Sequence, residues 1–215
     1  MKQNTIVGIV AFLALIGGVI GAIYIAPPGF KDKPETDYLS TYPAPRALAK
    51  VNLTDQRGEP FNLERLKGKW SLLFLGYTFC PDICPTTLAS LNRIYPELKQ
   101  IESEHPIQVV FVSVDPKRDT TTRLKEYTQF FNAEFIAATG NHDQLFPFVR
   151  SMGLMYALSE STENPNYLVD HSASVIVVNP QAQVIGRFKP VHQQGMPAIT
   201  DGQQILQDMS AITAG

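Results

Sequence analysis

The segment 76–85, GYTFCPDICP, constrains the fold of this chain more than any other part of its sequence. It holds both cysteines of the protein, Cys80 and Cys84, and separates an apolar run at 71–76 from a stretch at 86–101 with the helical period. The chain must therefore pass here from a buried strand into a helix, with two thiols at the junction. Thiols at this spacing near a helix start have Cα atoms about 6 Å apart, which suits either a disulfide or one shared soft metal ion.

The prolines of this segment favour a functional role for the cysteines. Pro81 and Pro85 end the strand and preset φ for a helix start. The sulfurs then lie beside helix N-terminal N–H groups, which stabilise a thiolate. A purely structural disulfide would contribute little, because so small a ring constrains the unfolded chain by only about 2 kcal/mol. We interpret Cys80 and Cys84 as a functional pair, either metal ligands or a redox-active dithiol.

The rest of the sequence predicts an α/β domain. After a hairpin at 53–61, apolar runs predict strands at 70–76, 107–114, 135–138, 174–178 and 183–188. Amphipathic or capped segments predict helices at 62–66, 86–104, 120–131, 141–152 and 197–212. Strands buried on both faces that alternate with helices indicate a central mixed sheet flanked by helices. A β-hairpin and a helix follow a β-α-β core, which is the thioredoxin-like order.

The chain of 215 residues divides into four predicted parts. Residues 1–5 form a short tail, and 6–26 is almost continuously apolar and about 20 residues long, enough for a bilayer-crossing helix. We expect an uncleaved transmembrane anchor there, with a cleaved secretory signal as the alternative. Five prolines among residues 27–45 predict a Pro-rich, extended spacer over 27–47. Residues 48–215 suit one thioredoxin-like domain with a proper core.

Charge and cysteine content indicate where the domain works. Two cysteines that are close enough to oxidise fit a domain exported to an oxidising compartment. We therefore expect a single-pass membrane protein with a cytoplasmic N-terminus and its domain on the periplasmic or equivalent exported side. The net charge is −2, and we see no basic patch interleaved with aromatic residues, which argues against nucleic acid as a partner.

A third candidate ligand lies far from the cysteines in the sequence. His171, in the segment VDHS, comes just before the strand at 174–178, which in a thioredoxin-like domain lies next to the strand that delivers Cys80. Two thiolates and an imidazole make a three-coordinate donor set suited to copper. Asp115 follows the strand at 107–114, at the sheet edge where ligand sites cluster. It would either support a metal site indirectly or cap the next helix.

Three motifs in order, GYTFCPDICP, SVDPKRDT and DHS before a strand, resemble the Sco/SenC family of membrane-anchored copper proteins. The similarity extends from Leu53 to the final helix. It implies a thioredoxin-like fold whose copper ligands here are Cys80, Cys84 and His171. It also implies assembly of the dinuclear copper centre of cytochrome c oxidase subunit II. We expect one copper ion per chain, as Cu(I) and also as Cu(II), and a copper-accepting partner of that kind.

Two functions from different classes stay open. The first is a copper chaperone, or metallochaperone, that passes copper to the sulfur and nitrogen ligands of its partner. The second is an enzyme, a membrane-anchored thiol-disulfide oxidoreductase in which Cys80 and Cys84 reduce the cysteines of that or another partner. Another copper donor or a thiol reductant would be a further partner. A peroxiredoxin-like peroxidase is disfavoured, because its TxxC pattern needs threonine where Tyr77 stands.

Overall fold

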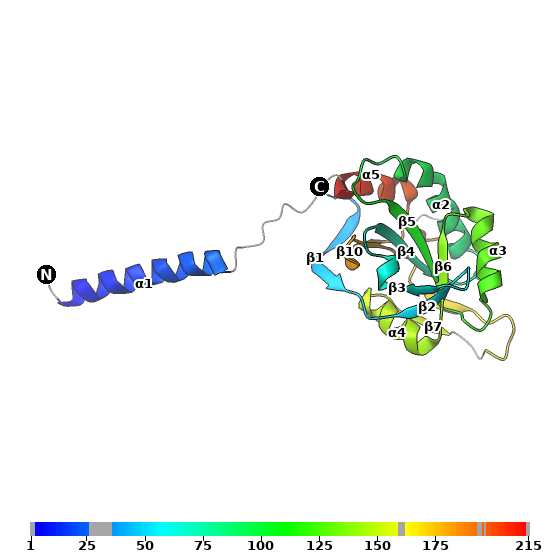
Figure 1. Ribbon diagram of the computed structural model, residues 1–215, viewed down its shortest axis with the longest axis horizontal. Helices are drawn as coiled ribbons and strands as arrows, with labels where there is room; N and C mark the ends of the chain where they lie inside the picture. The colour runs from blue at the N-terminus through cyan, green and yellow to red at the C-terminus, as the bar shows by residue number, and fades with distance from the viewer. Residues whose placement is uncertain (1–2, 26–35, 159–161, 193–194, 196, 214–215) are drawn as a thin grey trace. The chain divides into compact units, whose positions relative to one another are not determined.

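The computed structural model describes residues 3–25, 36–158, 162–192, 195 and 197–213. The chain divides into two compact units, 1–34 and 35–215, and each is described by itself. In the first unit, α1 (Gln3–Ile25, blue in Figure 1) is a single helix. Within the part of the chain that the structure describes, no helix combines the length and apolar character needed to cross a membrane. The transmembrane anchor predicted at 6–26 from the uncharged sequence is therefore not confirmed.

An eight-stranded mixed sheet forms the centre of the second unit, with the strand order β1-β10-β9-β4-β5-β6-β2-β3. Three neighbours run parallel: β4 (Trp70–Gly76), β5 (Ile107–Ser113) and β6 (Ile136–Thr139). On the other side of β4, β9 (Val175–Val178) and β10 (Gln183–Phe188) follow as antiparallel strands. β5 and β9 are buried along their whole length, as strands covered on both faces must be.

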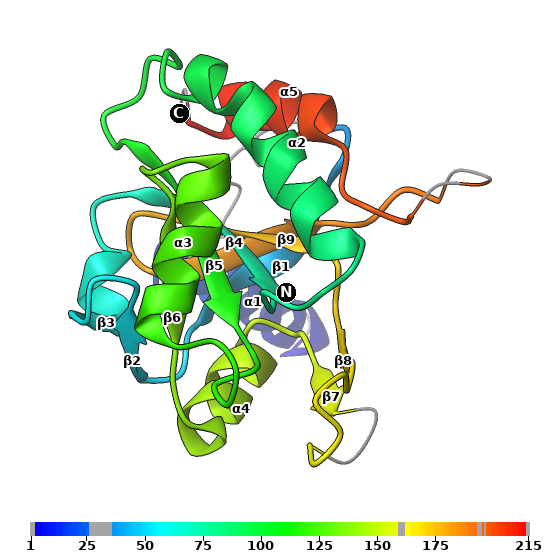
Figure 2. The same cartoon turned by 90° about the vertical axis from the view of Figure 1, so that its right-hand side faces the viewer.

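Helices cover both faces of this sheet. α2 (Ile83–Leu98) packs against both α3 (Thr121–Phe131) and α5 (Gly202–Thr213), and Figure 2 shows the three helices on one side. α4 (His142–Ser151) contacts β2 and lies on the other side of the sheet. The predicted α/β architecture, a mixed sheet between helices, is confirmed.

The start of the domain is also largely as predicted. β2 (Asn52–Asp55) and β3 (Pro60–Asn62) form the expected hairpin, and Gly58 in its turn has φ of +84°. The short helix expected next is one turn of 3₁₀-helix, η1 (Leu63–Arg65). Positive φ at the turn requires a residue such as glycine, which the sequence supplies there.

The helix after the cysteine segment begins earlier than predicted. The prediction was 86–104, whereas α2 begins at Ile83. Pro85 therefore falls in the first helical turn, where its missing N–H would have had no helical partner in any case. As a result Cys84 is part of the helix, while Cys80 lies in the loop before it.

The sheet begins earlier in the chain than predicted, within the range 27–47 that was expected to be a spacer. β1 (Leu39–Ala47) pairs antiparallel with β10 as an edge strand, and its register is irregular between Thr41 and Arg46. Two prolines fall in that irregular stretch, where a missing N–H costs no ladder bond. The buried Asp208 carboxylate of α5 holds the start of the strand, accepting hydrogen bonds from the backbone N–H of Leu39 and its neighbour. Residues 27–35 of the expected spacer lie outside the described residues.

A small second sheet was not predicted. β7 (Tyr156–Leu158) and β8 (Val169–His171) pair with each other as an antiparallel ribbon, separate from the eight-stranded sheet. Strands of three residues are too short to show a hydrophobic period. Tyr156 lies directly opposite His171 in this ribbon, which therefore carries the histidine to its place ahead of β9.

Candidate metal centre

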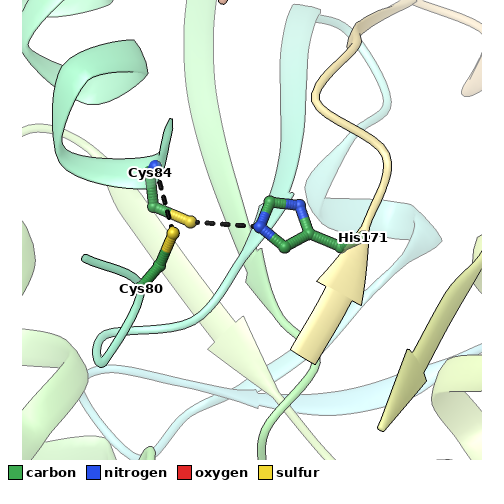
Figure 3. Close-up of side chains that lie close together, drawn as sticks. All are labelled: Cys80, Cys84 and His171. Atoms are coloured by element: carbon green, nitrogen blue, oxygen red, sulfur yellow. Dashed lines mark hydrogen bonds between the residues drawn. The ribbon is translucent and has the colours of Figure 1, made fainter. Parts of the chain in front are cut away.

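Two cysteines and one histidine meet beyond the carboxyl end of β4 (Figure 3). Cys80 comes from the loop after β4, Cys84 from the first turn of α2 and His171 from the end of β8. Their sulfur and imidazole nitrogen atoms all lie within 4.8 Å of one another. The structure thus brings together the three side chains that the sequence singled out as ligands.

The spacing of these atoms fits one small soft ion. The Sγ atom of Cys84 lies 3.3 Å from Nε2 of His171, and the backbone N–H of Cys84 points to Sγ of Cys80 at 3.4 Å. Both cysteines are free thiols. Three donor atoms at about 2.2 Å around a trigonal ion are about 3.8 Å from one another. Small side-chain adjustments therefore suffice to place all three donors around one ion.

The imidazole of His171 presents Nε2 to the thiols. Its Nδ1 atom lies 3.2 Å from the backbone carbonyl oxygen of Ser172. A carbonyl only accepts hydrogen bonds, so Nδ1 is the donor in that contact, and Nε2 is the ring nitrogen that faces the two sulfurs. The rings of Phe74 and Tyr77 meet the imidazole edge-on, with centroids 6.0 and 5.9 Å away. These contacts hold the ring plane in which Nε2 lies.

Gly76, the last residue of β4, leaves room for the Cys84 sulfur. A Cβ atom at this position would lie 2.7 Å from Sγ of Cys84 and 2.6 Å from Cε2 of Phe111. Both distances are shorter than van der Waals contact permits, and Cys84 is fully buried, with 0% of its surface exposed. The absence of a side chain at Gly76 is therefore a condition for the position of this thiol.

Asp119 fastens the loop that carries Cys80. Its buried carboxylate accepts hydrogen bonds from the backbone N–H of Thr78 at 2.9 Å, the hydroxyl of Thr78 at 2.6 Å and the hydroxyl of Ser113 at 2.5 Å. Burial raises the pKa of Asp119, while the bonds from Ser113 and Thr78 act in the opposite direction because they favour the charged form. The carboxylate thereby ties the ends of β4 and β5 together.

Asp115 does not cap the helix that follows it. The hydroxyl of Thr120 caps α3 by accepting a bond from the backbone N–H of Arg123. The Asp115 carboxylate instead accepts hydrogen bonds from Nε of Arg118 at 2.5 Å and from the hydroxyl of Tyr167. The sequence marked the segment SVDPKRDT, but it did not reveal the roles of Arg118 and Asp119 within it.

The two thiols differ strongly in acidity. Hydrogen bonds, chiefly from the Cys84 thiol and then from His171 and the backbone of Asp82, lower the pKa of Cys80 to about 4, although burial acts the other way. Burial raises the pKa of Cys84, and the neighbouring Cys80 sulfur raises it further. At neutral pH the pair therefore consists of a half-buried thiolate at Cys80 and a buried thiol at Cys84.

This difference predicts an unusual pH profile for Cys80. Alkylation by iodoacetamide, followed by mass spectrometry, should be nearly constant in rate from about pH 8 down to about pH 5, because the thiolate persists until its pKa near about 4. The depressed pKa also stabilises the fold; that contribution is fully present above about pH 9 and is lost as the pH falls through about 4. Cys84→Ala removes the main hydrogen-bond donor to the Cys80 sulfur. It should therefore raise the pH below which the alkylation rate of Cys80 declines. A wild-type rate that falls tenfold per pH unit below pH 8 would contradict this assignment.

Gly76→Ala should displace the Cys84 sulfur. Overpacking of this kind costs about 1–3 kcal/mol of unfolding free energy, and it should also make the buried thiol react faster with a thiol reagent. Gly140→Ala is a matched control, since its Cβ would lie 2.7 Å from Cδ2 of Leu53, away from the site. It should lower stability similarly and leave Cys84 unreactive. Equal Cys84 labelling in the two variants would show that Gly76 has no special role.

Comparison with known proteins gives one consistent family. The SCO1/SenC family model matches residues 41–206. An SCO2-like protein of Rickettsia conorii is 35% identical over 191 residues, covering 86% of this chain and 91% of its own. The copper-bound crystal structure of Arabidopsis thaliana ScoI matches with a TM-score of 0.65 and 29% identity over 76% of this chain and 95% of its own.

A second solved structure, yeast Sco1 with copper bound, matches with a TM-score of 0.60 and 26% identity, over 76% of this chain and 88% of its own. These structural likenesses, together with the mixed sheet between helices, confirm the predicted thioredoxin-like α/β fold. The family match covers most of the chain, including both cysteines and the histidine. The chain therefore belongs to the SCO1/SenC family.

Proposed function

We propose that this protein is a copper-binding assembly factor that holds one copper ion between the thiolates of Cys80 and Cys84 and Nε2 of His171. The observation that carries the proposal is that these donors, from three separate elements, converge within 4.8 Å. Thiolate sulfur favours Cu(I), and imidazole also suits Cu(II). The copper-bound relatives from Arabidopsis and yeast support the same reading.

Loading of copper requires a change of protonation at the buried cysteine. Cys80 is already a thiolate near neutral pH, whereas burial keeps Cys84 protonated. Because the thiolate is the ligand form, copper displaces the Cys84 proton as it binds. His171 binds metal as the neutral imidazole, through the Nε2 atom that faces the two sulfurs.

We further propose that the copper is delivered to the dinuclear copper site of cytochrome c oxidase subunit II. Membership of the family supports this choice of partner. The two sulfurs also differ in access: Cys84 is fully buried, while Cys80 is half-buried and follows Phe79, whose side chain is 48% exposed. An incoming ligand of the partner therefore meets the copper from the side of Cys80.

Thiol-disulfide exchange is the second candidate function, and the low pKa of Cys80 favours it. The Cys80 thiolate attacks one sulfur of a partner disulfide and releases the other as a thiolate. Cys84, once deprotonated, then attacks the mixed disulfide at the Cys80 sulfur and releases the second partner thiolate. The partner gains two electrons, its two thiolates take up one proton that Cys84 lost and one from water, and Cys80 and Cys84 end as a disulfide.

Substitution of each ligand separates the two functions. Cys80→Ala and Cys84→Ala should each abolish tight copper binding in an anaerobic titration, because each removes one of the two soft donors. His171→Ala should bind copper more weakly and fail to support oxidase assembly in a deletion strain, yet exchange disulfides roughly as the wild type does, because Cys80 keeps its chief hydrogen bond from Cys84. His105→Ala, a partly buried histidine before β5, should behave as wild type in all assays.

The His171→Ala variant decides between the candidates. Full restoration of oxidase assembly by this variant, with copper binding lost, would favour the oxidoreductase. Either single cysteine variant binding copper with wild-type stoichiometry and affinity would place the metal elsewhere and overturn the proposed site.

We also propose that the domain works on the exported side of a membrane. The support is the oxidisable thiol pair and the uncharged sequence between Gln3 and Phe30. A reporter enzyme fused after Gly215 that requires export should be active, and a protease added outside the cytoplasmic membrane should digest the domain. Activity of only a cytoplasm-dependent reporter at the same position would reverse this assignment.

A further inference from the structure

Two adjacent cationic side chains fasten the loop that leads to His171. Arg118 donates from Nη1 to the carbonyl oxygen of Pro165 at 3.0 Å and from Nη2 to that of Tyr167 at 2.9 Å. Lys117 donates from Nζ to the carbonyl oxygen of Thr162 at 2.7 Å. Three carbonyl groups of the loop between β7 and β8 are thus held by the segment that follows β5.

Arg118 also closes a buried polar triangle. Its side chain is only 12% exposed, and its Nε donates to the Asp115 carboxylate at 2.5 Å. The guanidinium lies 3.5 Å from the centroid of the Tyr167 ring, and the Tyr167 hydroxyl donates to the same carboxylate. Only a planar guanidinium with its fork of donors can bond one carboxylate and two carbonyls at once. Lysine could not replace it.

The position of His171 depends on this loop. β8 has three residues and pairs with β7, so among the described strands it makes no ladder with the eight-stranded sheet. A two-stranded ribbon is only marginally stable by itself. Tyr167 precedes β8 closely and is 2% exposed, so it attaches the β8 side of the ribbon to the domain, while Tyr156 attaches the β7 side through its contact with His142 of α4. Arg118 also lies 5.6 Å from the Tyr77 ring, which contacts the imidazole.

We propose that Arg118 is a positioning residue for the third copper ligand. Through Tyr167 and Asp115 it fixes where β8 presents Nε2 of His171 to the two thiols. This inference rests on the proposed function, in which His171 binds copper. Loss of the Arg118 side chain leaves both thiols in place and releases the imidazole.

The first test compares two arginines of the same region. Arg123 is exposed, and its guanidinium lies 5.3 Å from the Phe79 ring, much as that of Arg118 lies 4.8 Å from it. Its Nε donates to the hydroxyl of Thr78, away from the loop before β8. Arg118→Gln should weaken copper binding about 10- to 100-fold in an anaerobic competition assay and remove the imidazole contribution from the X-ray absorption spectrum. Arg123→Gln removes a contact of the Cys80 loop and none of the loop before β8, so it should keep the imidazole contribution of the wild type.

A double-mutant cycle separates positioning from general support of the fold. If Arg118 acts through His171, then Arg118→Gln in the His171→Ala background should cause no further loss of copper affinity. A structural role unrelated to the histidine would lower affinity by the same factor in both backgrounds, and that result overturns the inference.

The X-ray absorption spectrum of the copper-loaded wild type distinguishes a failure of the positioning role from a failure of the proposed copper site. A wild-type spectrum without an imidazole contribution refutes the copper site, and the positioning role with it. A wild-type imidazole contribution that Arg118→Gln retains overturns the positioning role alone. If Arg118→Gln does not fold, Tyr167→Phe removes only the hydroxyl bonded to Asp115, and it should show the same losses to a smaller degree. Wild-type affinity and spectrum in Tyr167→Phe would then overturn the inference.

Discussion

The geometry of the candidate metal centre depends on the hydrogen bonds that the buried carboxylate of Asp119 accepts. This carboxylate binds the backbone and side chain of Thr78 and so fixes the loop that carries Cys80. Arg118, the residue before it, binds the loop that leads to His171. The distance between thiols and imidazole is therefore set by two successive residues after β5, and a fully buried strand holds those residues in place. A site whose ligands come from different elements needs such a shared support to keep its geometry.

The sequence was sufficient to predict the central strands and most helices, because these segments carry strong hydrophobic patterns. β4 and β5 are mostly apolar, and α3 begins within one residue of the start predicted at 120. The missed elements lack such patterns. The two prolines of β1 favoured the prediction of an extended spacer. The irregular pairing with β10, which accommodates them, is not visible in the sequence. β7 and β8 have three residues each, so only tertiary contacts define them.

The meeting of the three candidate ligands was predictable, but their surroundings were not. The spacing of Cys80 and Cys84 and the place of His171 ahead of a strand were enough to select the three side chains. Which sulfur is buried depends on packing against Gly76 and Phe111, and residue types alone do not show that packing. The same is true of Arg118, because its partners Asp115 and Tyr167 come from separate loops.

The separation of the β7–β8 ribbon from the main sheet has a kinetic consequence. Under the proposed function, His171 can withdraw with the ribbon without breaking a ladder bond of the eight-stranded sheet. The time for which the copper ion stays bound is then governed by local opening of the ribbon. Such an opening requires less free energy than global unfolding. Such openings occur within microseconds to seconds, whereas global unfolding of a stable domain can take days. A very stable domain can in this way release its metal quickly while the strands behind the thiols remain intact.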